Sequence, residues 1–333
     1  MKKITLISSL TVLIAAISYG QTQQQLRNRI EGSDRPDATR QISSSKKSST
    51  SSSSDSNPSD SGAQRPVILK ESGISAYFGY DSKYFYRSNP LATDGKLKQQ
   101  ATGMWTNTFY TGAGLGVFEY SDSVVTPYIG GSWTINEYVE SEIDSFNYNS
   151  TSAYALLLFQ YGNGWSARAG VSYANDRSTE NDTEDYKEFQ PSIGIMKSYT
   201  INDSATAIFD ATIGRHLSES FVIAGLTDGA KTASEKELSN TEYALSYSVN
   251  YSWNEILISP KYRISYKDYD KGLNDGRSDL SNDISLKASY PITDSFKLSL
   301  FYSYSTRTAD GTSISYDYKS FDTGAGLGIN ARF

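Results

Sequence analysis

Hydrophobic and polar residues alternate along most of the chain after about residue 73. In the segment 295–307 the even positions are apolar, namely Phe296, Leu298, Leu300, Tyr302 and Tyr304. The positions between them are mostly lysine, serine and arginine. Alternation with a period of two predicts a β-strand with one apolar and one polar face. The segments 241–253 and 255–267 divide in the same way, so the pattern predicts an all-β chain.

Twelve segments of this kind follow one another along the chain. We expect strands at about 73–88, 106–120, 124–141, 149–161, 164–177, 186–200, 203–217, 241–253, 255–268, 280–291, 295–308 and 320–333. The connections between them are alternately very short and long. Short turns on one side and long loops on the other are typical of outer-membrane barrels. The predicted fold is therefore a transmembrane antiparallel up-and-down β-barrel of about 12 strands, with both termini on the short-turn side.

The residues before the barrel divide into two further parts. Residues 1–20 have two lysines, a short apolar run and small residues at the end, which is the pattern of a secretory signal peptide. Residues 21–70 are rich in glutamine and serine and bury too little apolar surface to offset the entropy of ordering, so we expect a disordered periplasmic segment. The barrel is expected to occupy residues 71–333.

The last strand carries a second signal. Its end has the terminal aromatic Phe333, and Ala331, Ile329, Leu327 and Ala325 precede it on the same face. In this respect the chain resembles outer-membrane β-barrel proteins in general. That resemblance implies that Phe333, Ile329 and Leu327 form an assembly signal for the barrel-assembly machinery, in the outer membrane of a Gram-negative-type cell.

The first strand supports a narrower resemblance. The sequence Gly79-Tyr80-Asp81-Ser82-Lys83-Tyr84-Phe85-Tyr86-Arg87-Ser88 is similar to the opening strand of an uncharacterised family of outer-membrane proteins, which reads roughly Ser-x-Tyr-x-Phe-Arg-Gly. Ser88 stands where that family has glycine. The similarity covers about a tenth of the chain and implies a location without an activity.

The hexapeptide Thr-Gly-Ala-Gly-Leu-Gly occurs twice, at 111–116 and at 323–328. A glycine-rich loop that binds nucleotides needs a strand followed by a helix, and neither copy has that context. On a strand the glycines of each copy share one face, which the register of Phe333 places toward the lumen. We interpret them as sites of close approach and curvature, and not as a ligand site.

Composition and charge exclude several classes of function. The net charge of -6 gives no basic surface for nucleic acid. The chain has no cysteine, so it has neither a lipoprotein anchor nor a disulfide framework. Tyrosine is abundant, with 26 residues, while only 38% of the residues are hydrophobic, which fits strands that are apolar on one face and aromatic at both interfaces. We expect no cofactor and no metal.

The polar faces of the last strands suggest a function. The face opposite Phe296, Ile256 and Phe333 carries a predicted basic wall of Lys261, Arg263, Lys267, Lys287, Lys297, Arg307 and Arg332, with Asp322 among the few acids. Basic residues inside a pore favour anions. The sequence therefore predicts a narrow pore or channel for small solutes, with anions favoured. Acids of other strands, such as Asp81, Glu119 and Asp210, are candidate partners for this wall.

Two alternatives remain open. The barrel could be closed by its own side chains and act as a structural or adhesive protein through its extracellular loops. It could also be a lipid hydrolase at the rim, in which His216 activates Ser218 two residues away. We expect no enzyme, because residues 214–219 lack the asparagine-rich context of the outer-membrane phospholipases that this pair resembles, and a histidine near a serine is common by chance. Acids in the long loops, such as Asp182 and Asp270, are candidates for calcium or for cation bridges to lipopolysaccharide.

Overall fold

The computed structural model describes residues 74–90, 92, 101–120, 123–162, 164–180, 182, 184–220, 238–311 and 317–332. The expected signal peptide at 1–20 and the Gln/Ser-rich segment at 21–70 lie outside these residues. Within them, no helix is long and apolar enough to cross a membrane.

Thirteen β-strands and two short 3-10 helices make up the described part of the chain. The strands are β1 Ser75–Arg87, β2 Thr102–Gly114, β3 Phe118–Tyr120, β4 Ser123–Tyr138, β5 Tyr148–Tyr161, β6 Trp165–Ser178, β7 Glu184–Asn202, β8 Ala205–Ser220, β9 Asn240–Trp253, β10 Ile256–Tyr269, β11 Ser278–Pro291, β12 Phe296–Asp310 and β13 Tyr318–Arg332. The 3-10 helices are η2 Asp144–Phe146 and η3 Gly272–Asn274.

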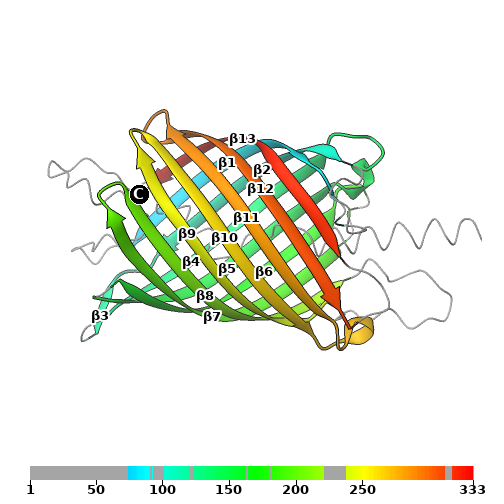
Figure 1. The fold of residues 1–333 in the computed structure, drawn as a ribbon, viewed down its shortest axis with the longest axis horizontal. Coiled ribbons are helices and arrows are strands. Elements are labelled where there is room, and N and C mark those ends of the chain that lie inside the picture. The colour runs from blue at the N-terminus through cyan, green and yellow to red at the C-terminus, as the bar shows by residue number, and fades with distance from the viewer. Residues whose placement is uncertain are drawn as a thin grey trace, which may run out of the picture.

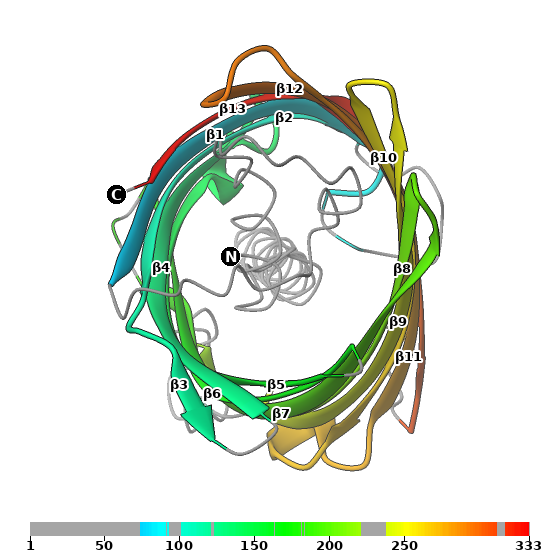
Figure 2. The same cartoon turned by 90° about the vertical axis from the view of Figure 1, so that its left-hand side faces the viewer.

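The strands form one closed antiparallel barrel, with each strand beside its neighbour in the sequence (Figure 1). Closure comes from β1, which pairs with β13 from Tyr77 opposite Arg332 to Arg87 opposite Asp322. Seen along its length, the barrel is a ring of strands (Figure 2). The fold class predicted from the sequence is confirmed: it is a transmembrane, up-and-down β-barrel of twelve strands, with β3 as an addition to the ring.

The short strand β3 corrects the expected strand 106–120. That strand begins earlier, at Thr102, and its pairing with β4 ends at Gly114, followed by one hydrogen bond from Leu115 N to Pro127 O, and resumes at Phe118. Gly116 lies in the interruption with a φ of 105°, in the left-handed region that glycine adopts readily. The chain bends there, and β3 and the first residues of β4 continue as a hairpin at the end of the barrel (Figure 1).

The connections alternate in length as the sequence predicts. Between two and four residues join the strands at 121–122, 162–164, 203–204, 254–255 and 292–295, and longer segments join them at 88–101, 139–147, 179–183, 221–239, 270–277 and 311–317. All of the short connections are at one end of the barrel, where β1 begins and β13 ends. We call the half of the barrel next to these turns the short-turn half and the other half the long-loop half.

The outer surface of the barrel is apolar. Large hydrophobic side chains are exposed at every second position, with Ile193 exposed by 60% and Leu300 by 58%. They include Ile129, Leu157, Ile195, Ile213, Leu245, Ile284 and Leu286 on neighbouring strands. A water-soluble barrel would bury such side chains, whereas a barrel in a membrane turns them toward lipid.

Exposed aromatic residues lie toward both ends of the strands. Near the short turns they are Tyr161, Trp165, Tyr199, Tyr251, Trp253 and Tyr290, and nearer the long loops they are Tyr84, Trp105, Trp133, Tyr173, Tyr243 and Tyr266. Aromatic girdles of this kind mark the two interfaces of a membrane. The apolar band between them fixes which part of the barrel is inside the bilayer.

The 139–147 connection packs into the lumen at the long-loop end. Ile143 and Phe146 are buried against the inward side chains Phe85, Met104 and Tyr138. This apolar cluster anchors η2 beside β1, β2 and β4. The connection therefore narrows the long-loop half of the lumen on that side.

Candidate functional site: the lumen wall

All seven residues of the predicted basic wall occupy inward-facing positions of their strands. Lys261, Arg263 and Lys267 alternate along β10 with the exposed Tyr262 and Tyr266. Lys287 on β11, Lys297 and Arg307 on β12, and Arg332 on β13 have the same parity. The side chain of Arg332 lies outside the described part of the structure, so the remaining six define the wall.

In the long-loop half, the bases of this wall lie beside acids. Arg263 Nη2 donates to Glu242 Oε1 at 2.9 Å, and Arg263 Nη1 lies 4.0 Å from Asp283 Oδ2. Lys267 is directly opposite Glu242 on β9 and Asp279 on β11. Charges of opposite sign at cross-strand distance compensate one another. This half of the wall is therefore a mixed charge network and not a basic surface.

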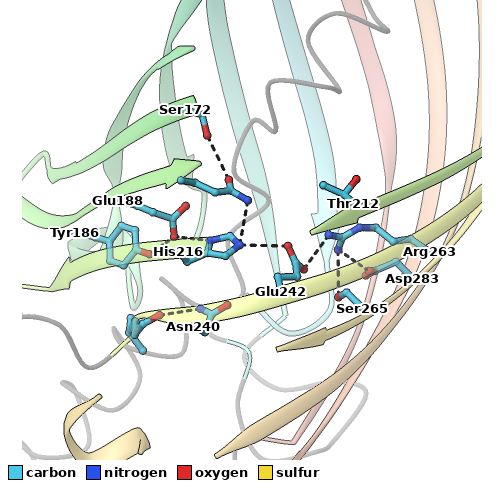
Figure 3. Close-up of polar contacts among 12 residues, drawn as sticks. Ser172, Tyr186, Glu188, Thr212, His216, Asn240, Glu242, Arg263, Ser265 and Asp283 are labelled. Atoms are coloured by element: carbon cyan, nitrogen blue, oxygen red, sulfur yellow. Dashed lines mark hydrogen bonds and ion pairs between the residues drawn. The ribbon is translucent and has the colours of Figure 1, made fainter. Parts of the chain in front are cut away.

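His216 is the centre of that network (Figure 3). Its Nδ1 lies 2.9 Å from Glu188 Oε2, and its Nε2 lies 3.3 Å from Glu242 Oε2 and 3.1 Å from Gln190 Nε2. Tyr186 donates its hydroxyl to Glu188 at 2.5 Å. With Arg263 and Asp283, these contacts form a polar chain across five neighbouring strands, β7 to β11.

A second network lies at the long-loop end of β10, β11 and β12. Arg277 Nε donates to Asp279 Oδ1 at 2.7 Å, and both side chains have no exposed surface. Tyr269 donates its hydroxyl to Asp279 at 3.2 Å, and Arg307 Nε lies 3.8 Å from the same carboxylate. Arg277 also donates to Asn274 at 3.1 Å. Asp279 thus connects three elements, including the loop that contains η3.

A third ion pair crosses a strand. Arg168 on β6 pairs with Asp210 on β8, and its guanidinium also donates to Thr212. The side chain reaches over Gly194 of β7, where a Cβ would lie 3.0 Å from the guanidinium carbon. Glycine at this position leaves room for the arginine to reach the next strand but one. Asp210, a candidate partner of the basic wall, is therefore paired with Arg168.

In the short-turn half the wall keeps its excess of positive charge. Lys261, Lys287 and Lys297, here called the lysine strip, lie near the short-turn ends of β10, β11 and β12. Lys261 is opposite Ser248 and Ser285, and Lys287 is opposite Ser259 and Phe301. Among the described residues of this half, the inward acids are Asp81, which lies 3.6 Å from Lys297, Asp210, which pairs with Arg168, and Glu119 on β3, which is opposite the inward Val124.

Four inward tyrosines line β1, β2, β4 and β5 in the short-turn half and the middle of the lumen. They are Tyr77, Tyr110, Tyr128 and Tyr154, here called the tyrosine strip. Three of them lie against glycines: an added Cβ at Gly79 would overlap the ring of Tyr110, at Gly112 that of Tyr77, and at Gly130 that of Tyr154. The hydroxyls of Tyr77 and Tyr154 are 2.5 Å apart.

The repeated hexapeptide is part of this wall. Gly112 and Gly114 belong to β2, and Gly324, Gly326 and Gly328 belong to β13. An added Cβ at Gly328 would overlap Lys297 and Asp81, which are inward side chains. The glycines face the lumen and permit close approach, as the sequence indicates. Gly116 is the exception, because it lies in the break between β2 and β3.

Sequence reasoning missed several inward charges. Asp279 and Asp283 lie an even number of residues from Lys287 on β11, and Glu242 lies an even number of residues from the inward serines of β9. The alternation itself could therefore have placed these three acids in the lumen. Lys83 on β1 shares the inward face with Asp81 and is exposed there. Glu188 could not have been paired with His216 without the register of β7 and β8.

The hydrolase alternative requires a contact that the described residues do not show. Both ring nitrogens of His216 contact side chains of β7 and β9, and Ser218 is bonded to Ser239 only through its main chain. The hydroxyl of Ser218 is buried and has no hydrogen-bond partner in this part of the structure. A base that activates a serine has to reach its hydroxyl, and His216 does not.

The acidic loop residues do not form a metal cluster within the described ranges. Asp182 pairs with Arg177 at 3.1 Å and Asp270 pairs with Arg215 at 2.6 Å. Of the proposed assembly signal, Ile329 and Leu327 are exposed on the outer face, and Phe333 lies outside the described residues.

No protein-family model matches the chain, and no curated protein matches it. Several solved barrels are similar in fold. An outer membrane channel from Pseudomonas putida F1 is 8% identical over 80% of this chain and 99% of that chain, with a TM-score of 0.48. The translocator domain of autotransporter NalP from Neisseria meningitidis is 10% identical over 79% of this chain and 90% of that chain, with a TM-score of 0.41. At this level of similarity, the function has to be inferred from the lumen of this chain.

Proposed function

We propose that the chain is an outer-membrane pore for small solutes and that it favours anions. The observation that carries the proposal is the separation of charge along the lumen. In the long-loop half, Arg263, Lys267 and Arg307 lie beside Glu242, Asp283 and Asp279. In the short-turn half, the inward bases Lys261, Lys287, Lys297 and Arg168 outnumber the inward acids Asp81, Asp210 and Glu119 among the described residues.

This separation produces a positive potential in one part of the lumen. A membrane and a protein wall have a low dielectric constant, so the field of the lysine strip is weakly screened by its surroundings. An anion that enters the lumen meets this field, and a cation is repelled by it. A twelve-stranded barrel lies between small filled barrels and the wide porins of 16 to 18 strands, so the passage is a narrow one.

The location is part of the same proposal. The apolar band between two aromatic girdles supports insertion in a membrane, and the short turns at the end where β1 begins support a periplasmic N-terminus. Assembly by the barrel-assembly machinery and contact with lipopolysaccharide follow from this location. We expect the protein to fractionate with outer membrane and to migrate faster unboiled than boiled on a detergent gel; recovery as a soluble periplasmic protein would contradict the location.

Ion selectivity in a planar bilayer tests the pore. With a salt gradient across the bilayer, the parent protein should pass anions in preference to cations. The double variant Lys261→Glu/Lys287→Glu should lose this preference or reverse it, because the sign of the field in the short-turn half changes. We choose Lys287 over Arg263 because Arg263 already binds Glu242, and a glutamate there would place like charges together.

The matched control is Lys197→Glu/Lys319→Glu. It makes the same change in charge on the outer face, where Lys197 lies over the ring of Trp165 and Lys319 is exposed near the long loops. Its selectivity should equal that of the parent. A parent that prefers cations would overturn the anion preference, and a folded parent that conducts no ions would overturn the pore and favour the closed, surface-binding barrel.

A further inference from the structure

Two members of the tyrosine strip, Tyr128 and Tyr154, lie across the lumen from the lysine strip, whereas Tyr77 on β1 lies two strands from Lys297 on β12. In the ring of twelve strands, β4 is six steps from β10 in both directions, and β5 is likewise six steps from β11. Tyr128 on β4 therefore faces the side of Lys261, and Tyr154 on β5 faces the side of Lys287. Figure 2 shows β4 across the lumen from β10. A solute in this part of the lumen has cations on one side and aromatic rings on the other.

The tyrosine rings are held against the wall by their glycines. The ring atoms of Tyr110, Tyr77 and Tyr154 occupy the space that a side chain at Gly79, Gly112 and Gly130 would need. Rings that lie over the backbone in this way are fixed by packing. They present their faces to the lumen, and not only their hydroxyls. The rings of Tyr77 and Tyr110 are 6.3 Å apart, so this surface is continuous between β1 and β2.

The strip combines aromatic faces with polar edges. The face of a tyrosine ring is electron-rich and attracts groups with positive edges, and its hydroxyl forms hydrogen bonds. A sugar ring has a face of C–H groups and a rim of hydroxyls, so it matches both properties. A plain aromatic acid has one carboxylate and no rim of hydroxyls, and a small inorganic anion has no face to lie on the rings.

We infer that the lumen binds acidic oligosaccharides, with the sugar faces on the tyrosine strip and the carboxylates toward the lysine strip. This inference rests on the proposed pore and names the class of its solute. The length of the strips supports an oligomer over a single sugar: the tyrosines extend over β1, β2, β4 and β5, and the lysines over β10, β11 and β12. A chain with one carboxylate per sugar can contact both strips at successive positions.

Block of the ion current by a uronate oligomer tests the inference. A mannuronate hexamer added to the parent channel in a planar bilayer should interrupt the current at lower concentration than a neutral glucose hexamer or benzoate. Tyr77→Leu/Tyr128→Leu keeps apolar bulk and removes the ring faces and hydroxyls. It should weaken the block about tenfold, because two aromatic contacts are lost. The Lys261→Glu/Lys287→Glu variant should weaken it as well.

The control variant, Tyr243→Leu/Tyr266→Leu, replaces two tyrosines on the outer face. The uronate oligomer should block its current at the same concentration as that of the parent. Both residues are exposed away from the lumen. If the parent conducts anions but the uronate oligomer blocks no better than the neutral one, the inference is wrong and the pore stands. The same conclusion follows if the Tyr77/Tyr128 variant conducts and is blocked like the parent. If the folded parent conducts no ions, the pore itself is wrong.

Discussion

Replacing Asp279 with alanine is expected to lower the free energy of unfolding of the barrel by about 3–5 kcal/mol. The carboxylate is fully buried and lies between two guanidinium groups, those of Arg277 and Arg307. Its removal leaves both positive charges in a buried position without the anion that they share. The hydroxyl of Tyr269 also loses its acceptor. Unfolding by urea, followed by tryptophan fluorescence, measures the change.

An exposed ion pair provides the control for this prediction. Asp182 pairs with Arg177 at 3.1 Å, but its side chain is 84% exposed. The Asp182→Ala variant should change the free energy of unfolding by less than about 1 kcal/mol, because water screens and replaces the interaction. Equal effects of the two substitutions would show that the Asp279 network contributes no more than a surface pair.

An arginine on the outer face should lower the free energy of unfolding strongly in the middle of a strand and only slightly near its end. Leu300→Arg is expected to destabilise the barrel by about 2–4 kcal/mol, since it places a charge near the centre of the bilayer. Leu300 is 58% exposed near the middle of β12, opposite Ala288 and Ala325. Unfolding of the protein in lipid vesicles measures the effect.

Thr308→Arg on the same strand is the matched comparison. Thr308 is exposed and has the same parity as Leu300, but it lies at the long-loop end of β12. Its cost should be about 0–1 kcal/mol, because the side chain reaches the interface. If the two variants were equally stable, the depth dependence that a lipid-facing surface imposes would be absent.

The strands and their faces could be predicted from the sequence because alternation is local. The even positions of 295–307 are apolar whether or not the partner strand is known, and β12 exposes Leu298, Leu300 and Tyr302 accordingly. The turn and loop lengths identified the topology for the same reason. The break at Gly116 was not predicted, although it shifts the register by one residue: Gly114 pairs with Tyr128 and Phe118 pairs with Val125, so the outward positions are odd before the break and even after it.

The charge pairs of the lumen could not be predicted in the same way. Arg263 lies opposite Asp283 only in the register that β10 and β11 adopt, and a slip of one residue would turn either side chain outward. An ion pair between strands that are not neighbours is harder still to predict from the sequence. Arg168 on β6 reaches Asp210 on β8 over Gly194 of β7, so the register of two strand pairs has to be known. The basic wall was therefore read as continuous, whereas its long-loop half contains Glu242, Asp279 and Asp283.

The packing of the 139–147 connection into the lumen also depended on the fold. Ile143 and Phe146 stand in a polar stretch that predicts only a loop. Their apolar side chains are buried because β1, β2 and β4 present Phe85, Met104 and Tyr138 at the same end of the barrel. No single segment of the sequence carries that information.

Cysteine labelling at two adjacent positions of β11 tests the central claim, an aqueous, positively charged lumen inside a lipid-facing barrel. The chain has no cysteine of its own, so single variants report on one position each. Ser285 faces the lumen opposite Lys261, and Leu286 is exposed on the outer face. In lipid vesicles, the Ser285→Cys variant should react with a water-soluble sulfonate thiol reagent, and faster than with an ammonium reagent of similar size. The Leu286→Cys variant should react only after unfolding. Labelling of both variants at the same rate, or faster reaction of Ser285→Cys with the cationic reagent, would contradict the account.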